Sequence, residues 1–229
     1  MFFGATYLGL DKWFRAEREL FSPDGGRFTY WANTNTSNEV HVVDVASGAD
    51  WIVYSGPTFY IPIAFEADAI YLVHAINTRQ GAFENLYRMD PSRGIPQLVP
   101  GSDRHMYQWG WIRIADGAAW GVDNVVQGNS YIYSVLRLNL ATSEVTRWFE
   151  APDNMFWPIG VDVSHRLYLA YQDQLLRLDA PSQVTHLSNP GALTPWGGPG
   201  GLSDFAADSR DVWLSGNSAV WLCGRSPAN

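Results

Sequence analysis

Residues 21–55 read FSPDGGRFTYWANTNTSNEVHVVDVASGADWIVYS, and this stretch determines how the rest of the chain is interpreted. It opens with the turn sequence Ser22-Pro23-Asp24-Gly25-Gly26, in which proline presets φ, aspartate bonds its own backbone and glycine accepts positive φ. Aromatic and β-branched residues, which favour strands, then fill 27–32, 40–45 and 51–54. A polar loop and an Ala-Ser-Gly turn separate these segments. The stretch therefore predicts three β-strands and no helix.

The same pattern returns along the chain. An aromatic residue within an apolar strand recurs at intervals of 41, 49, 48 and 45 residues, at Tyr30, Tyr71, Trp120, Tyr168 and Trp213. A polar turn follows each of the first four, beginning at Asp44, Asp90, Asn139 and Asp179. Periods of about 40–50 residues with four short strands each are typical of β-propeller blades. The sequence thus predicts one all-β domain over residues 1–229, a five-bladed β-propeller of four-stranded antiparallel blades.

The motif SPDGGRFTYWA followed by EVHVVDVASG resembles the blade repeat of TolB-like β-propellers, in which a Ser-Pro-Asp-Gly turn joins the first two strands. The match is close in 21–55, whereas the corresponding turns at 66–68, 115–117, 162–164 and 207–209 differ from it. The resemblance implies a fold superfamily that includes non-catalytic periplasmic scaffolds and propellers that gate substrates on peptidases. It implies no catalytic residue, because the repeat motif is structural.

The last blade lacks one strand in the sequence. Only 202–207, 211–215 and 219–223 have strand character there. A propeller must close its ring or cover its edge strands. We therefore expect 3–10 to supply the missing outer strand, and 11–20 to lead into the first inner strand. The alternatives are a fragment of a larger ring and, for 11–20, a short helix.

Composition excludes several classes of partner. The net charge is −8, Lys12 is the only lysine, and no basic cluster occurs, so neither nucleic acid nor an anionic membrane surface is expected as a partner. No apolar run is long enough to span a bilayer. We expect a monomer. The first residues lack the basic region of a signal peptide, which leaves a cytoplasmic protein, or an extracytoplasmic one whose leader has been removed.

An aromatic residue with Pro or Gly close behind it recurs before the inner strands of four blades. These residues are Tyr60, Trp109, Trp157 and Trp196. Flat aromatic faces bind sugar rings, other aromatics or cations. We interpret the set as the rim of the channel mouth, binding a small molecule, a glycan or a protein, with His105 and Asn154 as polar contacts. The alternative is that the four rings are wedges packed between blades.

Catalytic and metal motifs are absent from the sequence as local patterns. No two histidines have HxH or HxxxH spacing, so no zinc site is expected. Asp, Asn and His residues near the channel would suit calcium, but scattered aspartates are also ordinary turn residues, and we expect no cofactor. Glu66, Asp162 and Asp204 are the only enzyme-like set, three carboxylates in different blades as in glycoside hydrolases.

The favoured interpretation is a non-catalytic binding propeller. Two alternatives remain: a propeller hydrolase or lyase with carboxylates at the channel, and a sensor or gating domain of a larger protein.

Overall fold

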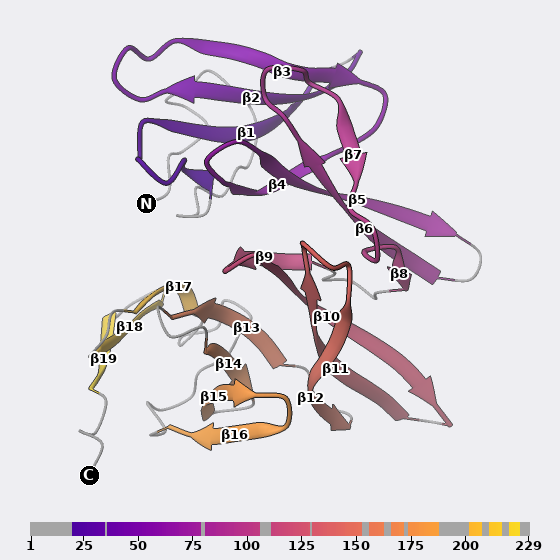
Figure 1. Cartoon of the computed structure of the whole chain (residues 1–229), viewed down its shortest axis with the longest axis vertical. Coiled ribbons are helices and arrows are strands. Elements are labelled where there is room, and N and C mark those ends of the chain that lie inside the picture. The colour runs from indigo at the N-terminus through magenta and orange to yellow at the C-terminus, as the bar shows by residue number, and fades with distance from the viewer. Residues whose placement is uncertain are drawn as a thin grey trace. The chain divides into compact units, whose positions relative to one another are not determined.

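The computed structural model describes residues 20–34, 36–78, 81–105, 111–128, 130–152, 156–162, 166–171, 174–187, 202–207, 211–216 and 220–224. Over these residues the backbone forms β-strands and turns, with no α-helix (Figure 1). The predicted all-β class is confirmed. The chain divides into two compact units, Met1–Ile114 with Leu140–Ser143 and Ala115–Asn139 with Glu144–Asn229. That residues 1–229 form a single domain stays a prediction.

The described strands of the first unit form antiparallel sheets. One sheet has the order β1-β2-β3, and Phe21 makes an isolated antiparallel bridge to Phe28. Its strands are β1 (Arg27–Asn33), β2 (Asn38–Asp44) and β3 (Asp50–Gly56). The next sheet has the order β4-β5-β6-β7, and β8 also pairs with β6. Its strands are β4 (Ile61–Phe65), β5 (Ile70–Thr78), β6 (Gly81–Met89), β7 (Pro96–Leu98) and β8 (Arg104–His105).

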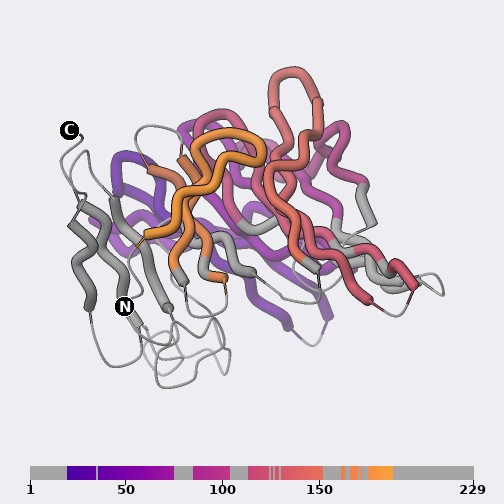
Figure 2. The backbone as a smooth tube through the Cα atoms, turned by 90° about the horizontal axis from the view of Figure 1, so that it is seen from below, coloured from indigo at the N-terminus to yellow at the C-terminus, as the bar shows by residue number. Residues whose placement is uncertain are grey.

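Three further sheets follow in sequence, in the orders β12-β11-β10-β9, β13-β14-β15-β16 and β17-β18-β19. The first comprises β9 (Trp111–Ala115), β10 (Ala118–Gln127), β11 (Ser130–Asn139) and β12 (Val145–Pro152). The second comprises β13 (Phe156–Val161), β14 (Leu167–Tyr171), β15 (Gln174–Ala180) and β16 (Gln183–His186). The third comprises β17 (Leu202–Ala207), β18 (Asp211–Gly216) and β19 (Val220–Gly224), which agree within one residue with the three strands expected at the C-terminal end. Figure 2 shows the same backbone turned by 90°.

Bulges occur in the first strand of several sheets. The register shifts between Pro62 and Ala64 in β4, between Pro158 and Gly160 in β13, and between Leu202 and Asp204 in β17. Proline lacks a backbone N–H and is tolerated in a sheet at an edge strand or beside a bulge. The prolines of two of the repeated aromatic-proline units, Pro62 in β4 and Pro158 in β13, therefore lie at bulges, where a missing N–H is tolerated.

The turns between the last two strands of each of the first four sheets share a left-handed residue. Its φ is +70° at Gly48, +65° at Gly94, +61° at Ser143 and +60° at Ser182. In the first two turns an aspartate caps the backbone: Asp44 Oδ1 accepts from Ser47 N at 2.7 Å, and Asp90 Oδ1 accepts from Ser92 N at 2.8 Å. This conformation explains the glycines of the first two turns, because glycine adopts positive φ without steric cost.

The first four of the recurring aromatic anchors are core residues. Tyr30, Tyr71, Trp120 and Tyr168 are all buried, and Trp213 lies in β18. In the first unit the main core cluster joins both sheets through Val40, Val42, Val53, Phe65, Ile70, Leu72 and Met89. The sequence period thus arises, in the first four sheets, because each repeats the same apolar layer. The expected closing strand 3–10 and segment 11–19 lie outside the described residues.

Candidate functional site

The structure describes only part of the predicted rim. Tyr60 directly precedes β4 and its side chain is described. For Trp157 in β13 and His105 in β8 the backbone alone is described, with Trp157 opposite Ala170 and His105 opposite Phe83. Trp109, Asn154 and Trp196 lie outside the described residues. That the six residues form one site stays a prediction.

Tyr60 belongs to a cluster of aromatic rings in the first unit, which we call the Tyr60 cluster. Its ring centroid lies 5.1 Å from that of Tyr54, 5.0 Å from that of Tyr87 and 5.6 Å from that of His74. The two tyrosine contacts are edge-to-face, with interplanar angles of 84° and 71°. Rings arranged in this way attract each other beyond the area that they bury. The cluster is held between β3, β5 and β6, the strands that carry the three partners.

Tyr60 contributes a neutral phenol to the Tyr60 cluster. Burial raises the pKa of Tyr60 to about 12, and the nearby Tyr87 and Tyr54 hydroxyls add to the shift. The Tyr60 phenol is therefore protonated at neutral pH and is able to donate a hydrogen bond. His74 is oriented by a 2.9 Å contact between its Nδ1 and the Phe59 carbonyl oxygen. Tyr54, Tyr60 and Tyr87 pack on the core while remaining partly exposed.

Three members of this cluster have no signal in the sequence. Tyr54, His74 and Tyr87 lie on three different strands, and only the pairing of those strands brings them to Tyr60. No spacing in the sequence signals such a contact. The one available signal is that Tyr60 lies next to an inner strand, where connecting segments meet.

Asp162, a candidate carboxylate, has a structural role in the second unit. Its side chain is fully buried and accepts from Arg166 Nη2 at 2.8 Å, from Arg166 Nε at 2.9 Å and from the Tyr168 hydroxyl at 3.0 Å. The Asp162 N–H also donates to the Arg166 carbonyl oxygen at 3.0 Å. A carboxylate held in this way closes the turn between β13 and β14. It could act as a general acid or base only by breaking these contacts.

The other two candidate carboxylates lie at related places. Glu66 follows β4 in the first unit, and its N–H donates to the Ala69 carbonyl oxygen at 2.8 Å, which closes a turn of the same kind. Asp204 lies in β17 of the second unit, opposite Ser215. Among the described side chains, no three His, Cys, Asp or Glu residues are grouped as a metal ion requires.

A titratable cluster surrounds His41 on the first sheet. His41 Nδ1 lies 3.1 Å from Asp50 Oδ1, and His41 Nε2 lies 3.2 Å from Glu39 Oε2. The Tyr30 hydroxyl donates to Asp50 Oδ2 at 2.7 Å, and the Tyr30 and His41 rings stack at 4.6 Å. Every member lies on β1, β2 or β3, so the cluster ties three strands together. His41 therefore has a structural role.

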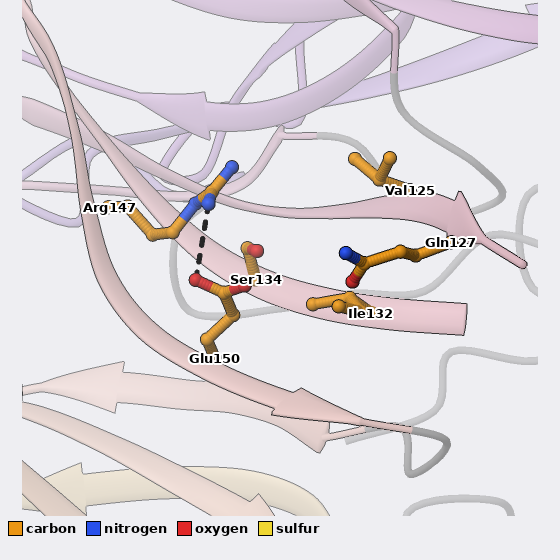
Figure 3. Close-up of a pocket in the computed structure, with 6 residues that line it drawn as sticks. All are labelled: Val125, Gln127, Ile132, Ser134, Arg147 and Glu150. Carbon is orange, nitrogen blue, oxygen red and sulfur yellow. Dashed lines mark hydrogen bonds and ion pairs between the residues drawn. The ribbon is translucent and has the colours of Figure 1, made fainter. Parts of the chain in front are cut away.

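A pocket that the sequence did not signal lies on the second unit. Its volume is about 320 Å³, and it is lined by residues of β10, β11 and β12, namely Val125, Gln127, Ile132, Ser134, Arg147 and Glu150 (Figure 3). Arg147 Nη1 and Glu150 Oε2 form an ion pair at 3.1 Å, with side chains 51% and 44% exposed. An exposed pair of this kind contributes at most about 1 kcal/mol to stability.

Comparison with known proteins identifies the fold. No family model matches the chain, and no curated protein matches its sequence. TolB from Acinetobacter baumannii is similar in structure, with a TM-score of 0.55 and 14% identity over 85% of this chain and 49% of TolB. An acylaminoacyl peptidase in complex with Z-Gly-Gly-Phe-chloromethyl ketone has a TM-score of 0.57 and 9% identity over 90% of this chain and 38% of the peptidase. The β-propeller domain of the Trilobed protease from Pyrococcus furiosus has a TM-score of 0.54 and 13% identity over 88% of this chain and 64% of that domain.

These similarities show the fold. The chain is related in structure to TolB and other β-propellers, which confirms the resemblance that residues 21–55 carry. It spans about half the length of TolB and less of the peptidase. In the described residues, no helix has the length and apolar character needed to cross a membrane.

Proposed function

We propose that the chain is a five-bladed propeller that binds a small molecule, a glycan or a protein at the mouth of its channel, without catalysis. The five described sheets support five blades. Each sheet contains one of the five aromatic anchors, which lie in β1, β5, β10, β14 and β18. The Phe21–Phe28 bridge supports a fourth, inner strand in the first blade. Closure of the ring by 3–10 is part of the proposal.

The Tyr60 cluster is the observation that favours binding. It places two phenol rings and an imidazole with their centroids 5.0–5.6 Å from that of Tyr60, which lies directly before β4. Ligand sites combine apolar surface with a few fixed polar groups, and partly exposed tyrosines provide both. Catalysis is disfavoured because Asp162, one of the three candidate carboxylates, is fully engaged with Arg166 and Tyr168.

A sensor or gating role within a larger protein is the second candidate. This candidate is favoured because the structural similarity covers only 49% of TolB and 38% of the peptidase, so each of those proteins contains more than the part that resembles this chain. Domains that fold alone often act as modules beside other domains. This candidate and the first agree on a binding surface and differ in whether the bound partner is a neighbouring domain.

The test is binding to glycan and peptide arrays, with each hit measured by calorimetry on the wild type, on Tyr60→Ala and on Tyr87→Ala. We expect both substitutions to weaken a hit at least tenfold. Tyr131→Ala is the control, because Tyr131 is an exposed tyrosine of the second unit. The proposal fails if no probe binds saturably, or if the hits keep their affinity in Tyr60→Ala and Tyr87→Ala.

A further inference from the structure

The pocket of Figure 3 exists because of a β-bulge in β12. Ser134 pairs with Glu150, Val135 with Phe149 and Leu136 with Arg147, so Trp148 has no partner residue on β11. Side chains alternate between the two faces of a strand, and residues three apart would face opposite sides. The additional residue brings Arg147 and Glu150 to one face, where they form their ion pair.

Contacts within the second unit hold the bulge in place. The Trp148 ring meets the Trp120 ring edge-on at 4.8 Å, and Trp148 Nε1 donates to Thr146 Oγ1 at 3.2 Å. The Trp148 carbonyl oxygen accepts from Ser182 N at 2.8 Å. Arg137 lies over both indoles, 5.6 Å and 6.0 Å from their centroids. The two charged side chains are therefore presented from a fixed backbone.

The ion pair is not needed to form the bulge. The first sheet has the same bulge in its outer strand, where Val40 pairs with Tyr54 and His41 with Ile52, leaving Val53 as the additional residue. Ile52 and Ser55 there occupy the positions of Arg147 and Glu150. Neither is charged. The charges at β12 thus depart from the repeat, as expected where a repeat protein has acquired a site.

Charged residues line one end of the pocket, and apolar residues line the other. Figure 3 shows Arg147 and Glu150 at one end, Val125, Gln127 and Ile132 at the other, and Ser134 between them. Val125 and Ile132 are directly opposed across the β10–β11 hairpin. Ser134, the partner of Glu150, lies two residues from Ile132 along β11, a distance of about 7 Å. This is the length of one small amino acid rather than of a longer chain.

We propose that this pocket binds a free aliphatic α-amino acid in its zwitterionic form. The ligand carboxylate would lie on the Arg147 guanidinium and its ammonium group on the Glu150 carboxylate. The aliphatic side chain would lie along Val125 and Ile132. An α-amino acid carries its opposite charges on neighbouring groups, which complements an ion pair whose atoms are 3.1 Å apart.

Other ligand classes fit this charge pattern less well. A dicarboxylate would bring a second negative charge towards Glu150, and a diamine would bring a second positive charge towards Arg147. The interior of a peptide carries neither charge, and each peptide end carries one. The ligand replaces an exposed ion pair that contributes little by itself, so binding does not require the fold to open. This site is separate from the Tyr60 cluster and does not depend on the function proposed for it.

The test is calorimetry on the whole chain with L-leucine, L-leucinamide and N-acetyl-L-leucine. The amide lacks the carboxylate and the acetylated form lacks the ammonium group. We expect saturable binding of L-leucine and at least tenfold weaker binding of both analogues. Arg147→Gln and Glu150→Gln should each weaken L-leucine binding at least tenfold. Arg93→Gln is the matched control, because Arg93 and Asp90 form another exposed ion pair between residues three apart, and it should bind as the wild type does.

A steric variant gives an independent readout. Val125 is half exposed, so Val125→Trp should fold and fill the apolar end of the pocket, abolishing L-leucine binding. The proposal is overturned if L-leucine gives no saturable heat at millimolar concentration, or if either analogue binds as tightly as L-leucine. It is equally overturned if Val125→Trp binds L-leucine as the wild type does.

Discussion

Replacing Gly94 by alanine tests the contact between the two sheets of the first unit. Gly94 has φ of +65°, and a Cβ built on it would lie 2.1 Å from the Val53 carbonyl oxygen and 3.3 Å from its carbon. No such contact is possible without moving backbone, since Val53 is the bulged residue of β3 and belongs to the core cluster. Gly48 is the matched control: its φ is +70°, and its Cβ would meet nothing within 4 Å.

Both substitutions carry the cost of placing alanine in a left-handed backbone conformation, and only Gly94→Ala carries an additional steric cost. Left-handed backbone costs an L-residue about 1–2 kcal/mol, and this is the whole expected loss for Gly48→Ala. Gly94→Ala adds the displacement of β3 from the turn, and overpacking of this kind typically costs about 1–3 kcal/mol. We therefore expect Gly94→Ala to lose about 2–5 kcal/mol in the free energy of unfolding.

Urea unfolding, followed by tryptophan fluorescence and circular dichroism, measures both losses. The difference between the two variants isolates the steric part, because the backbone part cancels. If Gly94→Ala and Gly48→Ala lose the same free energy within about 0.5 kcal/mol, then Gly94 does not approach Val53 in solution and the reasoning is refuted.

Two other predictions rest on single contacts, and a third tests the predicted rim. Asp162→Asn should lower the free energy of unfolding by about 2–4 kcal/mol, because it breaks a pair whose carboxylate is fully buried; Asp68→Asn, which breaks the exposed Arg88 pair, should cost less than about 1 kcal/mol in the same melt. The hydrogen bonds from Ser47 and Ser92 hold the pKa values of Asp44 and Asp90 below the ordinary 3.8. The two ionised carboxylates therefore stabilise the folded state above that pH, and this stabilisation is lost as pH falls through the lowered pKa values. Ser47→Ala combined with Ser92→Ala should flatten the acid branch of the melting-temperature profile, and an unchanged branch would contradict this. Trp109→Ala and Trp157→Ala should leave the melting temperature nearly unchanged if those rings line the channel mouth, whereas losses of about 3–5 kcal/mol in both would identify them as wedges.

The sheets could be predicted from the sequence because their signals are local and repeated. Strand residues and turn residues alternate in every described sheet, and the anchors Tyr30, Tyr71, Trp120 and Tyr168 are buried. The left-handed turns were signalled by Gly48 and Gly94. Ser143 and Ser182 adopt the same backbone and gave no such signal, because serine is common in turns of every type.

The sites could be predicted only in part because they depend on contacts between strands. The sequence predicts Tyr60 from the proline that follows it, but Tyr54, His74 and Tyr87 reach Tyr60 only through strand pairing. The pocket of Figure 3 depends on a single register shift at Trp148. Periodicity predicts that Arg147 and Glu150 face opposite sides of β12, and the bulge reverses this. A bulge has no sequence signature when its additional residue is an ordinary strand former such as tryptophan.

The bulges of β3 and β12 have the same backbone arrangement, which affects both the packing of the sheets and the pocket of Figure 3. In each, the carbonyl of the additional residue meets a left-handed residue in a turn of the following sheet: Val53 meets Gly94, and Trp148 accepts from Ser182. In both places the bulge thus contacts a turn of the following sheet. Its side effect is to place two residues three apart on one face. At β3 those residues are Ile52 and Ser55, which have no charge to pair, whereas at β12 they are Arg147 and Glu150. A binding site can therefore be added at such a bulge by changing two exposed side chains, without altering the contacts that stabilise the sheets.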